Sequence, residues 1–141
     1  MVLNRQKKMR VALAPLNEFL ERVKVETRSG DADVTVCLVS DAEMARLNQE
    51  FRRKRGPTDV LSFPAEGTKN AAAKRARFLG DIAIAPEAAR RYAIRNGRTL
   101  RGELRTLILH GVLHLMGYDH ETDHGQMDRI EKKLRRRLGL S

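Results

Sequence analysis

The sequence predicts an α/β protein of the α+β type, in which helices cover a small mixed four-stranded sheet and a central helix carries two histidines. Four short apolar or β-branched runs, at residues 2–4, 33–40, 60–64 and 79–86, are typical of strands. Between and after these runs, apolar residues recur at the three- and four-residue spacing of helices. Because the two kinds of segment are mixed along the chain, we expect the helices to pack on the sheet. The 141 residues contain no internal repeat and no linker, so a single domain spanning 1–141 is expected.

The first half of the chain is expected to form two strands and two helices. After the short strand at 2–4, five apolar residues at helical spacing between positions 13 and 23 indicate a helix. The run DVTVCLVS at 33–40 predicts a strand, in which the lone cysteine, Cys37, is a small buried hydrophobe. Ser40 followed by Glu43 has the pattern of a capping box and precedes a helix with apolar residues at 44, 47 and 51. The stretch RKRGP then ends that helix.

The second half is expected to form two more strands and three helices. Between the strands at 60–64 and 79–86, the charged segment 65–78 has no apolar periodicity and predicts a surface loop. A helix from Pro86 to Asn96 should end at Gly97, which can adopt the left-handed conformation of a helix terminus. A longer helix begins near Thr99 and reaches Met116. The last one, from about 123 to 138, places apolar residues at 127, 130, 134 and 138 on one side.

The charge of the chain indicates a polyanionic partner. Lys and Arg number 28 against 18 Asp and Glu, which gives a net charge of +10, and nucleic acid is the commonest ligand of so basic a domain. The basic residues at 132–137 are interleaved with apolar and acidic ones, as on a solvated helix face. Those beside the Gly-Pro turn, Arg53, Lys54 and Arg55, are candidate RNA contacts. Aromatic residues make up 4%, too few for a base-stacking platform, so phosphate contacts should dominate. No apolar run reaches the roughly 20 residues of a membrane span.

The stretch HGVLHLMGYDH, 110–120, is a candidate metal site. His110 and His114 are one helical turn apart and project from one face, Gly117 can end the helix, and the returning chain can bring His120 to the same point. Three imidazoles would bind one zinc ion per chain and leave a fourth position open, as catalytic sites do. Zinc peptidases share this frame but place a catalytic Glu after the first histidine, where this chain has Gly111.

Three further residues are candidates for a place in or near the site. His124 lies in a polar segment and is expected at the surface. Glu103 lies seven residues before His110 on the same stripe, about 10 Å away at 1.5 Å per residue, so it is a candidate for an ion pair or for an outer-shell role. Arg52, at the end of its helix, is a credible second cation for stabilising a phosphate transition state.

Three motifs together give the chain a family resemblance. HGVLHLMGYDH, PTDVLSFP at 57–64 and LGDIAIA at 79–85 resemble those of the YbeY family of endoribonucleases. The resemblance implies a cytoplasmic, zinc-dependent endoribonuclease that acts on single-stranded RNA, in maturation of small-subunit (16S) ribosomal RNA and ribosome quality control, with ribosomal proteins as partners. It assigns the metal ligands to His110, His114 and His120, with His114 also catalytic, and the functional arginine to Arg52. Two departures are a short opening segment and an unusually basic, alanine-rich 65–78.

Two questions stay open from the sequence. The nucleophile is either a metal-activated water or the 2′-hydroxyl of the RNA, because a zinc-bound water ionises near neutral pH without a dedicated base. The other is whether the chain is an enzyme of this kind at all. A metallopeptidase shares the histidine frame, although Gly111 argues against it, and a non-catalytic ribosome-assembly factor stabilised by zinc would have the same charge and ligands.

Overall fold

The sheet has four strands and is mixed, as the sequence predicted. The computed structural model describes residues 1–29, 31–56, 58–65, 78–118 and 124–140. Its strands are β1 (Val2–Asn4), β2 (Asp33–Leu38), β3 (Val60–Pro64) and β4 (Phe78–Ile84), in the order β1-β2-β4-β3. The pairs β1–β2 and β2–β4 are parallel, whereas β3 runs antiparallel to β4, with Ser62 opposite Ile82. The edge strand β1 is present but has only three residues.

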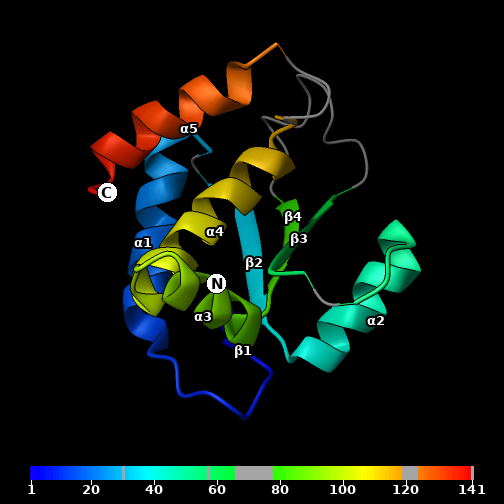
Figure 1. Cartoon of the computed structure of the whole chain (residues 1–141). Helices are drawn as coiled ribbons and strands as arrows, with labels where there is room; N and C mark the ends of the chain where they lie inside the picture. The colour runs from blue at the N-terminus through cyan, green and yellow to red at the C-terminus, as the bar shows by residue number, and fades with distance from the viewer. Residues whose placement is uncertain (30, 57, 66–77, 119–123, 141) are drawn as a thin grey trace.

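Five helices surround the sheet (Figure 1): α1 (Leu13–Glu26), α2 (Asp41–Arg52), α3 (Pro86–Arg95), α4 (Leu100–Leu115) and α5 (Gln126–Arg137). Helices α1, α3, α4 and α5 contribute to one apolar cluster with buried residues of β2 and β4, including Val36 and Ile82. Helix α2 packs on the other face, where Met44 meets Leu61 and Ala83. The sheet is therefore covered on both faces, and α4 and α2 lie on opposite ones. Within the described ranges, no helix is both long and apolar enough to cross a membrane.

Helix α4 is the central element of the larger cluster. From Leu107 to Leu115 its apolar side chains are at most 5% exposed, because the helix is enclosed by β4, α1, α3 and α5. This confirms the buried central helix predicted from the run LILHGVLHLM. The buried apolar residues of α5, Met127 and Leu134, confirm the apolar side predicted for the last helix, although that helix begins at Gln126 rather than near 123.

Two sequence expectations need correction. The sequence predicts a buried Cys37, but this residue is only half-buried, since it faces the α2 side of the sheet, where the apolar cluster is small. Partial burial raises the pKa of its thiol. Phe51 fits the apolar periodicity of its helix, yet it is 61% exposed, and it meets the sheet at Phe63, with ring centroids 5.1 Å apart. Almost all of the predicted surface loop 65–78 lies outside the described residues.

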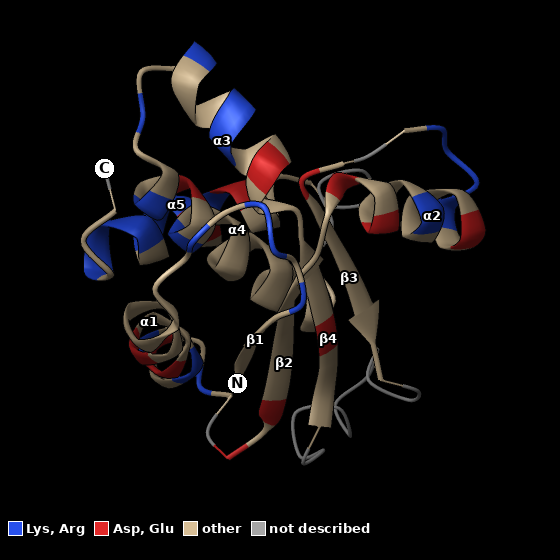
Figure 2. Cartoon of the chain, turned by 90° about the horizontal axis from the view of Figure 1, so that it is seen from below, with Lys and Arg blue, Asp and Glu red and all other residues tan. Residues whose placement is uncertain are grey.

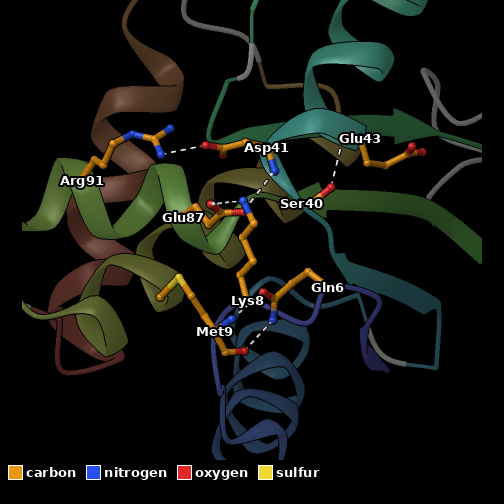
Figure 3. A network of polar contacts seen from close by, with 8 residues as sticks. All are labelled: Gln6, Lys8, Met9, Ser40, Asp41, Glu43, Glu87 and Arg91. Atoms are coloured by element: carbon orange, nitrogen blue, oxygen red, sulfur yellow. Dashed lines mark hydrogen bonds and ion pairs between the residues drawn. The ribbon is translucent and has the colours of Figure 1, made fainter.

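A polar network ties α2 to α3 at their N-terminal ends (Figure 3). The Arg91 guanidinium donates to Asp41 Oδ2 at 2.7 Å, and the backbone amide of Asp41 donates to Glu87 Oε1 at 3.5 Å. Ser40 Oγ accepts from the amide of Glu43 at 3.1 Å, which confirms the first half of the capping box. The Glu43 carboxylate instead pairs with Arg46 on its own helix. The network fixes where α2 leaves the sheet and so orients its C-terminal end, which carries the candidate RNA contacts.

Candidate metal centre and nucleic-acid interface

His110 and His114 lie side by side in the last two turns of α4. Their Nε2 atoms are 2.9 Å apart, and their rings meet edge to face with centroids 4.5 Å apart. Both rings are half-buried, so they are accessible from outside although the helix around them is enclosed. The four-residue spacing therefore places both side chains on one face of the helix, as the sequence predicted, and brings their Nε2 atoms close together.

The separation of the two nitrogens fits a shared metal ion. Two imidazole nitrogens bound at about 2.0–2.1 Å to one tetrahedral zinc ion lie roughly 3.3 Å apart. The observed 2.9 Å is shorter by a few tenths of an ångström, which small rotations of the two side chains can supply. Neutral imidazole is a common zinc ligand, so the donor set suits zinc.

The third expected ligand, His120, lies outside the described residues, as do its neighbours Asp119 and Glu121. Among the described residues, no group of three or more His, Cys, Asp or Glu side chains is placed to hold a metal ion. The chain does turn where the sequence predicted. Gly117 has a φ of +97° and the amide of Tyr118 donates to Leu113 O at 3.1 Å, which ends α4. His124 is exposed, as expected.

Gly111 holds the position where zinc peptidases carry their catalytic glutamate, and the structure explains why it is glycine. A Cβ there would lie 2.8 Å from Ile82 Cδ1 and 2.9 Å from Ile82 Cγ2, so the backbone of α4 packs directly on the Ile82 side chain of β4 at this point. The Gly111 carbonyl also accepts a hydrogen bond from Ser62 Oγ at 3.2 Å. Residue 111 therefore faces the sheet, and a side chain at this position would not point towards the histidines.

A second close contact seats the same helix one turn further on. Gly80 has a φ of +144°, and a Cβ on it would lie 2.8 Å from Leu115 Cδ2 and would also overlap the carbonyl oxygen of Phe63. The motifs PTDVLSFP, LGDIAIA and HGVLHLMGYDH thus meet in two adjacent contacts, Ser62–Gly111–Ile82 and Phe63–Gly80–Leu115. Their small residues let the helix approach the β3–β4 pair closely and fix the height of the histidines above the sheet.

Glu131 on α5 is a site residue that sequence reasoning did not assign. Its Oε1 lies 3.6 Å from His110 Nδ1, and its side chain is only 15% exposed. A carboxylate at this nitrogen favours the tautomer that carries its proton on Nδ1, in which Nε2 carries the lone pair that a metal ion would need. The available signal was a lone acidic residue on the apolar side of a strongly basic helix, close to Met127.

Glu103 takes the ion-pair role that the sequence allowed, far from the histidines. It is 3% exposed, and its Oε2 lies 3.8 Å from Arg98 Nη1. Burial raises the pKa of its carboxyl, while the charges of Arg98 and Arg135 act in the opposite direction. The residue helps to hold the start of α4 and has no direct place in the metal centre.

Arg52 ends α2, on the face of the sheet opposite α4. Its side chain is exposed, and no hydrogen bond or ion pair holds it to another described residue, His110 and His114 included. It nevertheless lies at the same end of the sheet as they do. Phe51, its neighbour, contacts Phe63, and the backbone of Phe63 borders the contact between Gly80 and Leu115, which follows His114. A strand of RNA crossing this end of the sheet would reach both sides.

The basic segment after Arg52 is exposed at Arg53, Lys54 and Arg55. Its backbone is held by Asn48, whose buried side chain donates to Gly56 O at 2.9 Å and whose carbonyl accepts from the Lys54 amide at 3.2 Å. Arg53 adopts a left-handed conformation, with a φ of +54°. The three cations therefore project from an anchored turn, a suitable arrangement for contacts to phosphates.

Comparison with known proteins identifies the family. Residues 1–139 match the family described as "YbeY: Endoribonuclease YbeY". The chain belongs to this family. Its sequence is 43% identical to the "Endoribonuclease YbeY" of Koribacter versatilis over 140 residues, which cover 99% of this chain and 86% of that protein. It is also 43% identical to that of Solibacter usitatus over 125 residues, or 89% of this chain and 78% of that protein.

A solved structure agrees with the YbeY assignment. The solution structure of TM1509 from Thermotoga maritima is 33% identical in sequence, covers 98% of this chain and 89% of its own, and has a TM-score of 0.66. The resemblance drawn from the three motifs is thereby confirmed. Of the residues expected for a YbeY site, the structure brings His110 and His114 together and places Arg52 to Arg55 around the edge of the sheet from them.

Proposed function

We propose that this chain is a zinc-dependent endoribonuclease that cuts single-stranded RNA in the cytoplasm. Its substrate would be the precursor of small-subunit (16S) ribosomal RNA, with a further role in ribosome quality control and with ribosomal proteins as partners. Membership of the YbeY family supports RNA cleavage. The observation that carries the metal-dependent chemistry is the 2.9 Å approach of the His110 and His114 Nε2 atoms on a buried helix. The net charge of +10 supports a polyanionic substrate.

The residues have distinct roles in this proposal. His110, His114 and His120 would hold one zinc ion, and Glu131 would keep His110 in the tautomer that binds it. When bound, zinc supplies Lewis acidity towards a phosphate oxygen and lowers the pKa of water. Arg52 would stabilise the negative charge that develops on the phosphate.

The basic segment 53–55 has a supporting role, and Gly111 limits which group can act as the base. Arg53, Lys54 and Arg55 would contact neighbouring phosphates without reading sequence. Gly111 contributes no base, since its position faces Ile82. The proton on the nucleophile must therefore leave through another group or through solvent. Analysis of the cut ends decides between the two nucleophiles, because a 2′,3′-cyclic phosphate forms only when the ribose hydroxyl attacks.

The first test compares wild type with His114→Ala and with His124→Ala, which removes an exposed histidine outside the candidate site. Zinc content and cleavage of a labelled single-stranded RNA are measured on all three. We expect wild type and His124→Ala to hold zinc and cut, and His114→Ala to lose both. Equal cutting by all three would mean that the activity comes from a contaminant. If wild type holds zinc and cuts no RNA, the chain acts as a zinc-stabilised assembly factor.

A second test addresses chemistry apart from metal binding. Arg52→Ala should leave zinc content and stability unchanged, because this side chain is exposed and no hydrogen bond or ion pair holds it to another described residue. It should lower the rate of cleavage by about 10²-fold, the typical cost of removing one group that stabilises transition-state charge. Arg95→Ala, which removes an exposed arginine from α3, is the matched control. An unchanged rate in Arg52→Ala would remove this residue from the reaction.

The metallopeptidase alternative is disfavoured by one observation. Residue 111 faces Ile82, so the catalytic glutamate of the zinc peptidases has no equivalent at the place their frame requires. Casein incubated with the zinc-loaded protein should remain intact under conditions in which RNA is cut.

A further inference from the structure

A pocket lies at the end of α4 opposite the histidines. It has a volume of about 500 Å³ and opens between residues 97–106 and the C-terminal end of α5. Four arginines line it: Arg98, Arg101, Arg105 and Arg135. None of the described residues that line it is acidic. Cations gathered in a hollow reinforce one another's field, so this pocket should attract an anion.

The arginines of the pocket are only partly compensated by the protein itself. Among the described residues, no carboxylate pairs with Arg101 or Arg105. The Nε atom of Arg105 is buried and makes no hydrogen bond, although its guanidinium stacks over the Phe19 ring at 5.6 Å. Burial, together with the nearby Arg101 and Arg22 cations, lowers the pKa of Arg105. A desolvated donor beside like charges is unfavourable until an acceptor satisfies it.

The other two arginines are engaged with neighbouring groups. Arg98 lies 3.8 Å from the buried Glu103, and Arg135 donates to Thr106 Oγ1 at 3.2 Å. Because Arg101 and Arg105 have no such carboxylate within the described part of the chain, the pocket keeps an excess of positive charge. Guanidinium groups present planar pairs of donors that match the oxygens of a phosphate.

The pocket and the histidine site both border the seam between α4 and α5. Glu131 contacts His110, and one turn further along both helices Arg135 contacts Thr106. The two helices therefore run antiparallel, as Figure 1 shows. Each four-residue step along a helix is about 6 Å, so the pocket begins roughly one turn from the histidines. Figure 2 shows basic residues gathered on α5, on α3 and on the segment that follows α3.

We propose that this pocket binds a backbone phosphate of the RNA strand whose scissile bond lies at the histidines. The inference rests on the proposed function for the identity of the ligand, and extends it with a second anchoring point. A strand held in the pocket would follow the α4–α5 seam to the metal centre. Recognition of a phosphate carries no sequence information, so the pocket would fix the position of the strand and not select its bases.

The experiment measures RNA binding without cleavage. A labelled oligouridylate is titrated with protein in EDTA, and anisotropy gives its Kd at several salt concentrations. The pocket variant is Arg101→Gln/Arg105→Gln. The control is Arg90→Gln/Arg95→Gln, which removes two exposed arginines of α3 and changes the net charge equally. Because Arg105 packs on Phe19, unfolding of each variant is monitored, and Arg101→Gln alone serves if the double variant is unstable.

We expect the pocket variant to raise Kd by roughly tenfold or more, and the control to raise it by less than about threefold. The salt dependence of log Kd should also become shallower in the pocket variant, by about one for each phosphate that its RNA complex no longer neutralises. Equal increases of Kd in both double variants would show that net charge alone matters and would overturn the proposal. Unchanged RNA affinity in the pocket variant would overturn it as well.

Two further measurements distinguish RNA from a free anion as the ligand of the pocket, and distinguish failure of the pocket proposal from failure of the nuclease proposal. If inorganic phosphate binds wild type but not the pocket variant, while both bind the oligouridylate equally, the pocket takes a free anion and the RNA proposal is wrong. Cleavage is assayed independently on zinc-loaded protein. A protein that cuts no RNA, yet binds RNA more weakly in the pocket variant, would keep the pocket and lose the nuclease. If the wild type cuts RNA and the pocket variant binds RNA as tightly as the wild type does, the nuclease proposal stands and the pocket proposal is wrong.

Discussion

The contact between Gly111 and Ile82 makes a quantitative prediction for Gly111→Ala. In an open helix this change would stabilise by about 1 kcal/mol, because glycine is a poor helix former. Here the new Cβ would lie 2.8 and 2.9 Å from two carbons of Ile82, which is itself fully buried. Carbon atoms prefer about 3.5–4.0 Å, and forcing an extra methyl into a packed core costs typically about 1–3 kcal/mol. We therefore expect a net loss of about 1 kcal/mol in the free energy of unfolding.

A double-mutant cycle shows whether Ile82 is the cause. Urea unfolding followed by circular dichroism is measured for Gly111→Ala, for Ile82→Ala and for the pair. Ile82→Ala removes both of these carbons and also Cγ1, which would lie 3.1 Å from the new Cβ, so the alanine at 111 should be tolerated better in that background, with a coupling of about 0.5 kcal/mol or more. Additive effects, or a Gly111→Ala variant more stable than wild type, would refute this account of the helix–sheet contact.

Gly111→Glu would restore the glutamate of the zinc peptidases and so test whether a side chain at this position can reach the histidines. It should destabilise by about 3–5 kcal/mol, as an unpaired buried charge does, and should give no peptidase activity.

Three other changes have definite expected outcomes. Glu131→Gln should weaken zinc binding by about 10–100-fold, measured by competition with a chelator. The control is Asp128→Asn on the exposed face of α5, and an equal effect of the two changes would contradict the orienting role of Glu131. Burial raises the pKa of Glu103, so its protonated form is favoured in the folded state, and the protein should lose stability as pH rises through the raised value. Glu103→Gln should therefore be more stable than wild type at pH 7 in urea unfolding, and this advantage should shrink as pH falls from the raised pKa to the ordinary glutamate pKa of about 4.3, whereas an advantage that does not change with pH would refute the reasoning. Ser40→Ala should lower the free energy of unfolding by about 1 kcal/mol in the same assay, through loss of the cap on α2, and no change would mean that water replaces the cap.

Local patterns predicted the elements correctly, and they also predicted that His110 and His114 lie side by side. The strands, α4 and the approach of His110 to His114 depend on spacings of two, three and four residues, which the sequence displays directly. The boundaries were less certain where capping is weak. Helix α5 begins after Gly125 with no side-chain cap, and it starts later than its apolar pattern suggests.

Contacts between distant segments were beyond the reach of the sequence. The position of Glu131 beside His110 depends on how α5 lies along α4. The reason for a glycine at 111 depends on which residue of β4 lies beneath it, and this residue is Ile82. The arginine pocket joins residues 97–106 to residues 135–140, whereas the last basic run by itself indicates only a solvated face. Phe51 fits the helical periodicity, but the sheet is too narrow on that side to cover it.

The packing of α4 on β3 and β4 also bears on how the protein unfolds. Strand β4 pairs with β2, more than forty positions earlier in the chain, and the backbone of α4 at Gly111 packs directly on the Ile82 side chain of β4. Local fraying therefore cannot separate the two histidines while the sheet is intact. Amide hydrogens around Ile108 and Val112 should exchange with solvent only through global unfolding, and a bound metal should slow their exchange in proportion to its occupancy. The two histidines thus report on the cooperativity of the whole fold.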